Sequence, residues 1–238
     1  MTGSTRGIGL ATAQALAGAG HTVIITGRDE AAVQVVCSSP EMHGLADGVQ
    51  LDVTDPDSVR ATAEHIRTKH GKLDILVNNA GVLPEAMDPE PHEYASADMF
   101  RKTFETNVFG AVAVTEALLP LLRASAAGRI VNVSSRLGSL TDQCDPTSPY
   151  YAAAVPAYQC SKAALNSVTI GLSKKLAGSN VVATSVCPGF VQTDLTPINH
   201  EQAPLTAQDA AKVIVEAALL PDGAHSGTFV DANGPVRW

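Results

Sequence analysis

The sequence lacks the features that mark membrane, secreted and repeat proteins. It has no run of about 18 apolar residues, and its N-terminus has no basic region followed by an apolar core, so neither a membrane span nor a secretory signal is predicted. Internal repeats and low-complexity tracts are also absent, which excludes solenoids and linkers. We therefore expect a soluble cytoplasmic enzyme with no membrane partner.

Cysteine pairs and basic patches are missing too. The four cysteines, at positions 37, 144, 160 and 187, form no C-x-x-C pair and no metal-ligand spacing, so free thiols and no metal site are predicted. The net charge is −8 and the basic residues are scattered. We therefore expect no nucleic-acid partner and favour a small-molecule substrate.

What the sequence does contain is an alternation of apolar strands and Ala-rich helices. With 238 residues and 45% hydrophobic content, the chain can form one large domain. Strands are expected at 23–26, 48–53, 73–77, 129–133, 181–186 and 228–230. Helices are expected at roughly 7–18, 29–38, 56–70, 97–123, 157–177 and 206–219. Uniformly apolar strands are typical of a parallel sheet that is buried on both faces. The pattern predicts an α/β, doubly wound, Rossmann-type sheet.

A glycine-rich turn opens the chain. Gly3, Gly7 and Gly9 lack side chains, so backbone N–H groups and the positive end of the next helix can approach a pyrophosphate. Taken alone, the segment is equally compatible with a flexible N-terminal arm.

Tyr158 and Lys162 are four residues apart on an expected helix and so share one face. The Lys ammonium can then lower the pKa of the phenol, which begins near ~10. Such a phenol can give a proton to a carbonyl oxygen while a nicotinamide supplies hydride. A pair with this spacing is otherwise an ordinary solvated helix face.

The order of the motifs resembles the short-chain dehydrogenase/reductase family over essentially the whole chain. The matching segments are Thr2-Gly3-x-x-x-Gly7-x-Gly9, Asn78-Asn79-Ala80-Gly81, Asn107, Ser135-x-x-Gly138, Tyr158-x-x-x-Lys162 and Pro188-Gly189-x-x-x-Thr193. The resemblance implies one domain over 1–238, with a cofactor half at about 1–130 and a catalytic and substrate half at about 131–238.

The resemblance also implies the roles of the site residues. Catalysis would rest on Asn107, Ser135, Tyr158 and Lys162. Asn107 would belong to a water chain that feeds protons to Lys162, and Ser135 is preferred to Ser134 because it stands three residues before Gly138. The implied cofactor-binding residues are Gly3, Ser4, Thr5, Arg6, Gly7, Ile8, Gly9, Arg28, Asp52, Val53, Asn79, Ala80, Gly81, Tyr158, Lys162, Pro188, Gly189, Val191 and Thr193.

The cofactor depends on the end of the strand at 23–26. Gly27 stands where NAD enzymes of the family carry Asp, and Arg28 and Arg6 are cations suited to a 2′-phosphate. NADP is therefore favoured, with Asp52 as the implied adenine contact. Asp29 and Glu30 are better explained by the dipole of the helix that they begin.

Two departures from the family pattern are visible. The interval from Ser135 to Tyr158 is longer than usual, and the extra segment, 140–151, is equally compatible with a surface loop and with a roof over the substrate cleft. In addition, Met1 directly precedes Thr2, where family members carry an apolar first strand. We expect either an upstream start or a weakened sheet.

The favoured function is an NADP-dependent reductase that converts a ketone or aldehyde into an alcohol, with Tyr158 as the general acid. The alternatives are an NAD-dependent alcohol dehydrogenase and a non-catalytic NADP-binding regulator. Substrate-lining residues are expected within 82–96, 136–157 and 190–205. Homodimer, homotetramer and monomer are all compatible with the sequence.

Overall fold

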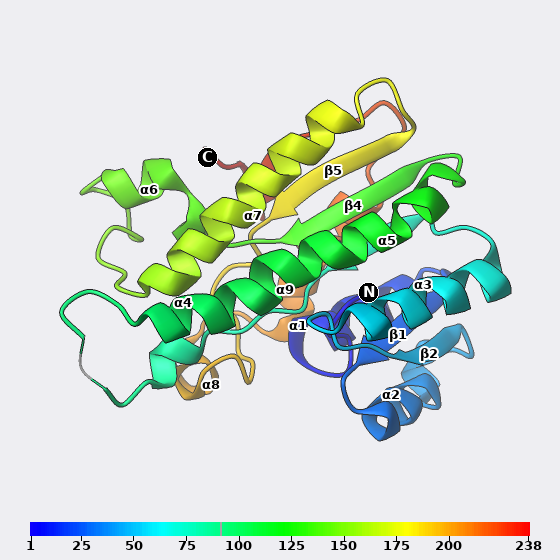
Figure 1. The fold of residues 1–238 in the computed structure, drawn as a ribbon, viewed down its shortest axis with the longest axis horizontal. Coiled ribbons are helices and arrows are strands. Elements are labelled where there is room, and N and C mark those ends of the chain that lie inside the picture. The colour runs from blue at the N-terminus through cyan, green and yellow to red at the C-terminus, as the bar shows by residue number, and fades with distance from the viewer. Residues whose placement is uncertain (91) are drawn as a thin grey trace.

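The structure is a computed structural model that describes residues 1–90 and 92–238, and it confirms the α/β fold with a doubly wound sheet (Figure 1). The parallel strands are β1 (Val23–Gly27), β2 (Ala46–Gln50), β3 (Ile75–Asn78), β4 (Gly128–Val133), β5 (Val181–Val186) and β6 (Thr228–Asp231). The short strand β7 (Gly234–Pro235) pairs antiparallel with β6 at the edge, and the sequence does not predict it.

The sheet is interrupted between β1 and β3, where the chain begins. β2 and β1 form one section, and the other section has the order β3-β4-β5-β6-β7. Residues 1–4 lie between the two sections, because the Met1 amino group donates to Ile24 O at 3.0 Å and Thr2 N–H donates to Val77 O at 3.0 Å. Ser4 N–H then donates to Thr26 O at 2.9 Å. The first four residues thus bond to both neighbouring strands.

Helices cover both faces of the sheet (Figure 1). One face carries α1 (Gly7–Gly18), α2 (Glu30–Cys37) and α9 (Ala207–Ala218), and the other carries α3 (Pro56–His70), α5 (Ala111–Arg123) and α7 (Pro156–Lys175). These helices lie close to the ranges that the sequence predicts.

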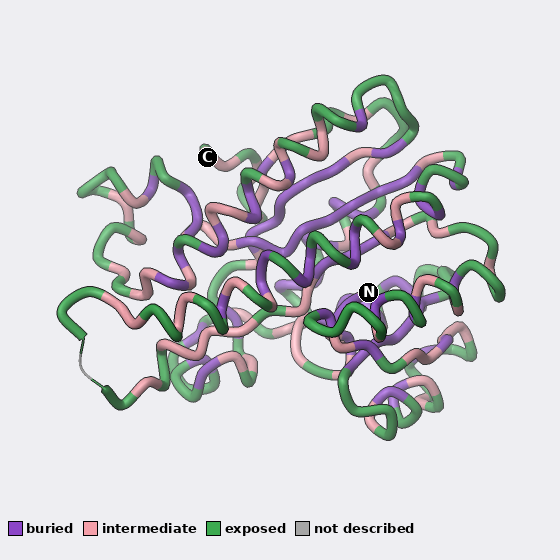
Figure 2. The backbone as a smooth tube through the Cα atoms, viewed as in Figure 1, coloured by how far each residue is buried: buried purple, intermediate pink, exposed green. Residues whose placement is uncertain are grey.

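Successive strand residues point to opposite faces, as strand geometry requires. Leu76 and Ile130 pack in a cluster with α3 and α5, whereas Val77 and Val131 pack in a cluster with α9. Strands β1, β4 and β5 are accordingly buried along almost their whole length (Figure 2). This double burial explains why the inner strands are rich in Val and Ile on both faces.

The long helix before β4 has an unexpected middle section. The segment expected as one helix over 97–123 consists of α4 (Ala97–Phe104), a π-helical segment, η3 (Glu105–Gly110), and α5. By length and composition alone, Ala97–Arg123 could cross a membrane. Its buried residues, such as Val114 and Leu118, pack in the core cluster with Leu76 and Ile130, and this packing accounts for its apolar character.

Five short elements of the described chain were not predicted from the sequence. These are the turns η1 (Pro40–Met42), η2 (Pro84–Met87) and η4 (Arg136–Gly138) and the helices α6 (Leu140–Cys144) and α8 (Pro197–Gln202). The strand expected at 48–53 runs from Ala46 to Gln50 instead, and beyond it the Leu51 N–H still donates to Gly27 O at 2.9 Å. Gly71 ends α3 in the left-handed conformation at φ 71°, as its position after the helix predicts.

Candidate active site

Helix α7 places Tyr158 and Lys162 side by side. The Lys162 Nζ lies 5.4 Å from the centre of the Tyr158 ring and donates to Val133 O at 2.8 Å. Val133 is the last residue of β4, so this bond ties the helix to the carboxyl end of a central strand. The side chains therefore meet at the strand ends, where open α/β sheets bind ligands.

The protonation of the pair differs from the sequence-based expectation. Burial raises the pKa of Tyr158 well above its ordinary value, Cys187 raises it further, and a hydrogen bond with Ser135 lowers it. Burial also lowers the pKa of Lys162 to about 8. The expected net lowering of the phenol pKa by Lys162 is absent, because burial dominates and the ammonium bonds to Val133 O. The phenol is therefore protonated at neutral pH and can act as a proton donor.

The two serines after β4 face different partners. The Ser134 hydroxyl donates to Lys162 O at 3.4 Å, whereas the Ser135 hydroxyl caps η4 by accepting from Leu137 N–H at 3.2 Å and lies close enough to Tyr158 to lower the pKa of its phenol. Gly138 packs directly on α7, since a Cβ there would lie 2.6 Å from Lys162 Cβ. The Ser-x-x-Gly spacing thus serves to bring the Ser135 turn against the Tyr158 helix.

Asn107 lies on the π-helical segment and is buried. Its Oδ1 accepts from Val82 N–H at 2.8 Å, and its Nδ2 donates to Val82 O at 3.0 Å and to the Ser161 hydroxyl at 3.1 Å. The side chain therefore joins the segment after β3 to α7. A role in a water chain to Lys162 stays a prediction. Single-turn π segments inside helices frequently occur at functional sites.

The glycine-rich turn is closed on itself and on β3. Gly3 and Gly7 have φ of +60° and +54°, and a Cβ on Gly9 would lie 2.1 Å from Gly3 O. The Asn79 side chain donates to Thr2 O at 3.0 Å and to Gly3 O at 2.9 Å. The Thr2 hydroxyl accepts from the N–H groups of Asn79 and Ala80 at 2.9 and 3.0 Å. This bonded turn before α1 excludes the flexible-arm alternative.

The turn also lies beside the end of β1. A Cβ on Gly27 would come within 2.7 Å of the Thr5 methyl group, so the Thr5 side chain lies directly against the Gly27 backbone. Arg6 directly follows Thr5, and Arg28 directly follows Gly27. Hydrogen bonds from Thr54 lower the pKa of Asp52. The positive charge of the exposed Arg28 also lowers it. Val53 packs closely against the π segment, because a Cβ on Gly110 would lie 2.7 Å from a Val53 methyl carbon.

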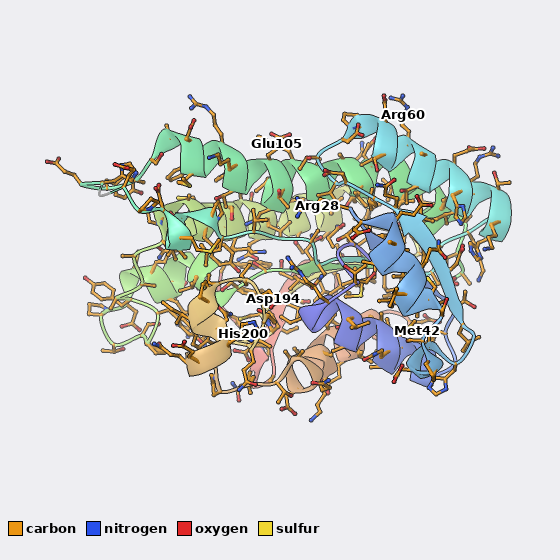
Figure 3. All side chains as sticks on the ribbon, turned by 90° about the horizontal axis from the view of Figure 1, so that it is seen from below. Arg28, Met42, Arg60, Glu105, Asp194 and His200 are labelled. Atoms are coloured by element: carbon orange, nitrogen blue, oxygen red, sulfur yellow. The ribbon has the colours of Figure 1, made fainter. Side chains whose placement is uncertain are left out.

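The loop after β5 carries the remaining predicted cofactor residues and contacts the glycine-rich turn. Thr193 lies against the turn, since its methyl carbon would be 3.4 Å from a Cβ on Gly7. Asp194 pairs with Arg6 at 3.7 Å and with His200 Nε2 at 2.7 Å, and Figure 3 shows Asp194 and His200 together near α8. Pro188 and Gly189, with φ +88°, make the bend that precedes Val191.

The extra segment before α7 faces the site. Arg136, next to Ser135, donates to both oxygens of Asp142 at 2.8 and 2.9 Å and lies 4.9 Å from the centre of the Tyr150 ring. Burial, with a contribution from Cys187, raises the pKa of Tyr150. These contacts favour the roof over the plain surface loop. No sequence motif marks Arg136, Asp142, Tyr150 or Cys187 as site residues, although Arg136 directly follows Ser135.

Cys187 is a buried free thiol that contributes to the charge environment of both Tyr158 and Lys162. Burial raises the pKa of the Cys187 thiol. A separate cavity of about 430 Å³ lies between α9 and the β6–β7 edge, lined among others by Thr184, Val213 and Thr228. Neither Ser135 nor Tyr158 lines it, so we do not assign it to the substrate.

Comparison with known proteins places the chain in a family. Residues 1–203 match the short chain dehydrogenase family. A short-chain dehydrogenase, anuI, from Penicillium roqueforti is 35% identical, over 92% of this chain and 86% of its own length. Salutaridine reductase from Papaver bracteatum is 32% identical, over 98% of this chain and 93% of its own length. The chain therefore belongs to the short-chain dehydrogenase/reductase family of oxidoreductases.

Solved structures agree with this assignment. The NADPH-bound carbonyl reductase from chicken fatty liver is 25% identical, with a TM-score of 0.83 over 99% of this chain and 96% of that one. Salutaridine reductase from Papaver somniferum is 29% identical, with a TM-score of 0.78 over 95% of this chain and 97% of that one. The fold is that of the carbonyl-reductase-like members of the family.

Proposed function

We propose that the protein is an NADP-dependent reductase that converts a ketone or aldehyde into an alcohol. The observation that carries the proposal is the convergence of Ser135, Tyr158 and Lys162 at the carboxyl end of β4, with a phenol that holds its proton at neutral pH. Carbonyl reductases and salutaridine reductase are similar to this chain, which supports the reaction class.

The cofactor residues fit a dinucleotide. Gly3 and Gly9 allow the turn to pack tightly before the N-terminus of α1, because a Cβ on Gly9 would collide with Gly3 O, and such helix ends bind pyrophosphates. Lys162 would hold the nicotinamide ribose, and Asn79 to Gly81 would line the adjoining backbone. When bound, the nicotinamide supplies hydride to the carbonyl carbon.

The chain's own residues would complete the reduction at the carbonyl oxygen. Tyr158 gives its phenolic proton to this oxygen as the negative charge develops. Ser135, whose hydroxyl lies close enough to Tyr158 to lower the pKa of the phenol, donates a hydrogen bond to the same oxygen and holds it there. The buried Lys162 ammonium lies close enough to stabilise the phenolate that remains.

The preference for NADP rests on the end of β1. Gly27 has no room for a side chain beside Thr5, so the carboxylate that would bind a ribose 2′-hydroxyl is not accommodated there. Arg28 is exposed at the next position and available for a 2′-phosphate. The chicken reductase with NADPH and a gluconate 5-dehydrogenase from Burkholderia cenocepacia with NADP support the same choice.

The decisive experiment is a screen of ketones and aldehydes with NADPH oxidation followed by absorbance. We expect turnover of at least one carbonyl compound and a loss of about 10²–10⁴-fold in kcat for Tyr158→Phe, the usual contribution of general acid catalysis. Calorimetry should show nearly unchanged NADPH affinity for this variant. A Tyr158→Phe protein that retains more than about a tenth of wild-type kcat would contradict the assigned acid.

A further inference from the structure

We propose that Glu85 is a positioning residue for Tyr158, an inference that rests on the proposed function. Glu85 lies on η2, in the segment that follows β3. Its Oε2 accepts from Ala157 N–H at 3.0 Å, and its Oε1 accepts from Tyr158 N–H at 2.6 Å. The carboxylate therefore caps α7, the helix that carries Tyr158 and Lys162, from outside that helix.

The N-terminus of α7 needs this acceptor. The first N–H groups of a helix have no partner within it, and their positive ends favour a negative charge. Pro156 has no N–H, and Gln159 N–H donates to Val155 O at 2.9 Å, which leaves Ala157 and Tyr158. The Val155 side chain provides no cap. In the described part of the chain, Glu85 is the side chain that satisfies both donors.

The cap acts on the residue whose phenol reacts. Glu85 binds the Tyr158 N–H, and the Ser161 hydroxyl donates to Tyr158 O at 2.8 Å. Ser161 in turn accepts from Asn107, which also holds Val82. Both ends of the Tyr158 backbone unit are thus connected to the stretch from Val82 to Glu85.

A purely structural cap would not require this arrangement. Asp29 caps α2 and Thr206 caps α9 from positions adjoining their own helices. Glu85 is instead 73 residues from Tyr158 and joins the segment after β3 to the catalytic helix. Its loss would change the relative position of these two segments, and misplacements of about 1 Å at a reacting group can cost about 10²-fold in rate.

The test compares Glu85→Ala and Glu85→Gln with Thr206→Ala, which removes a cap from a helix without candidate catalytic residues. Hydrogen exchange at the start of α7, measured without substrate, reports the cap. Steady-state kinetics with NADPH and with its C4-deuterated form report the chemical step. Calorimetry measures NADPH affinity.

We expect Glu85→Ala to accelerate exchange at Ala157 and Tyr158, to lower kcat by about tenfold or more, and to increase the isotope effect. NADPH affinity should stay within about twofold, since Glu85 is not a cofactor residue. Glu85→Gln, which keeps one acceptor oxygen, should be intermediate and remains informative if the alanine variant does not fold.

Two results would overturn the proposal. Unchanged exchange in both Glu85 variants would show that no cap is formed in solution. Faster exchange at the start of α7 in a Glu85 variant, with kcat within about twofold of wild type, would show that Glu85 is an ordinary helix cap. Thr206→Ala, which removes the cap of α9, is expected to leave kcat within the same twofold range. If the wild-type protein reduces no carbonyl compound, the proposed function fails, whereas the exchange measurement still decides whether Glu85 holds Tyr158.

Discussion

Gly138 and Lys162 approach so closely that a Cβ on the glycine would lie 2.6 Å from both the Cβ and the carbonyl carbon of the lysine. The contact presses the turn that carries Ser135 onto the helix that carries Tyr158. Side chains do not tolerate such distances, so even one added methyl group must separate these two elements.

We therefore expect Gly138→Ala to lower both stability and turnover. Overpacking should cost about 1–3 kcal/mol in the free energy of unfolding, and kcat should fall because Ser135 moves relative to Tyr158. Gly171, on α7, is the control glycine, because an added Cβ there meets nothing within 4 Å. Gly171→Ala should leave kcat unchanged and raise stability by about 0.5–1 kcal/mol. Similar kcat values for the two variants would contradict the argument.

A second prediction concerns Asp47, a buried carboxylate on β2. Burial alone would raise its pKa, but hydrogen bonds from Lys69, His70 and His65 at 2.6 to 2.8 Å outweigh it and lower the pKa to about 2. Because the folded pKa lies below the ordinary value of 3.8, the stabilisation is present above pH 3.8 and is lost as pH falls toward 2. It corresponds to about 2 kcal/mol.

Urea unfolding of Asp47→Asn at pH 7 and near pH 2 checks this prediction. The variant should be about 2 kcal/mol less stable than wild type at neutral pH, and the difference should shrink as Asp47 of the wild type becomes protonated. Glu64→Gln, which removes an exposed carboxylate on α3 paired with Arg67, should change little. A stability difference for Asp47→Asn that is independent of pH would refute the linkage.

The third prediction addresses the cofactor. Arg28→Asp should weaken NADPH binding by about 2 to 4 kcal/mol, because a charge-assisted pair with the 2′-phosphate is replaced by repulsion. NADH should gain in relative affinity. Arg60, an exposed arginine on α3 in Figure 3, offers a control, and Arg60→Asp should leave both affinities unchanged. Equal calorimetric affinities of wild-type protein for NADH and NADPH would refute the assignment of Arg28.

The fourth prediction concerns the interruption of the sheet. Met1, Thr2, Ile24 and Leu76 line a small cavity between β1 and β3, and burial lowers the pKa of the Met1 amino group to about 5. An added strand of about five to six β-branched residues ahead of Met1 would replace this amino group with a peptide N–H and pair with both neighbours. We expect higher melting temperature and tighter NADPH binding.

An N-terminal extension of the same length, made only of Gly and Ser, is the control for this experiment. It supplies the same peptide N–H but little β propensity and no apolar side chains to fill the cavity, so it should raise neither quantity. If the β-branched extension melts within about a degree of the unextended chain and binds NADPH equally, the pairing it was designed to make does not form.

Local patterns made most of the fold predictable. The helix at Pro56–His70 begins after a capping Asp55 and ends at Gly71, and β4 and β5 are short apolar runs. The start of β2 was misplaced because it includes Asp47, whose carboxylate is stabilised by residues on α3 about 20 positions away. No local pattern indicates that such a carboxylate is buried.

The site was predictable only where spacing along the chain carries the chemistry. Tyr158 and Lys162 meet because of helix geometry, and Ser135 is placed by its distance from Gly138. Glu85 could not be found in this way, because its partners lie more than 70 residues away. The raised pKa of Tyr158 also depends on burial by the whole fold, which no spacing reveals.

The π-helical segment at Glu105–Gly110 gives the long helix a change of phase. An α-helix advances about 100° per residue, so one additional residue rotates everything before it relative to everything after it. Deleting one residue from this segment would make the helix more regular and would turn Asn107 away from Val82 and Ser161. A regular α-helix at this position would therefore lose the Asn107 hydrogen bonds that join the segment after β3 to α7.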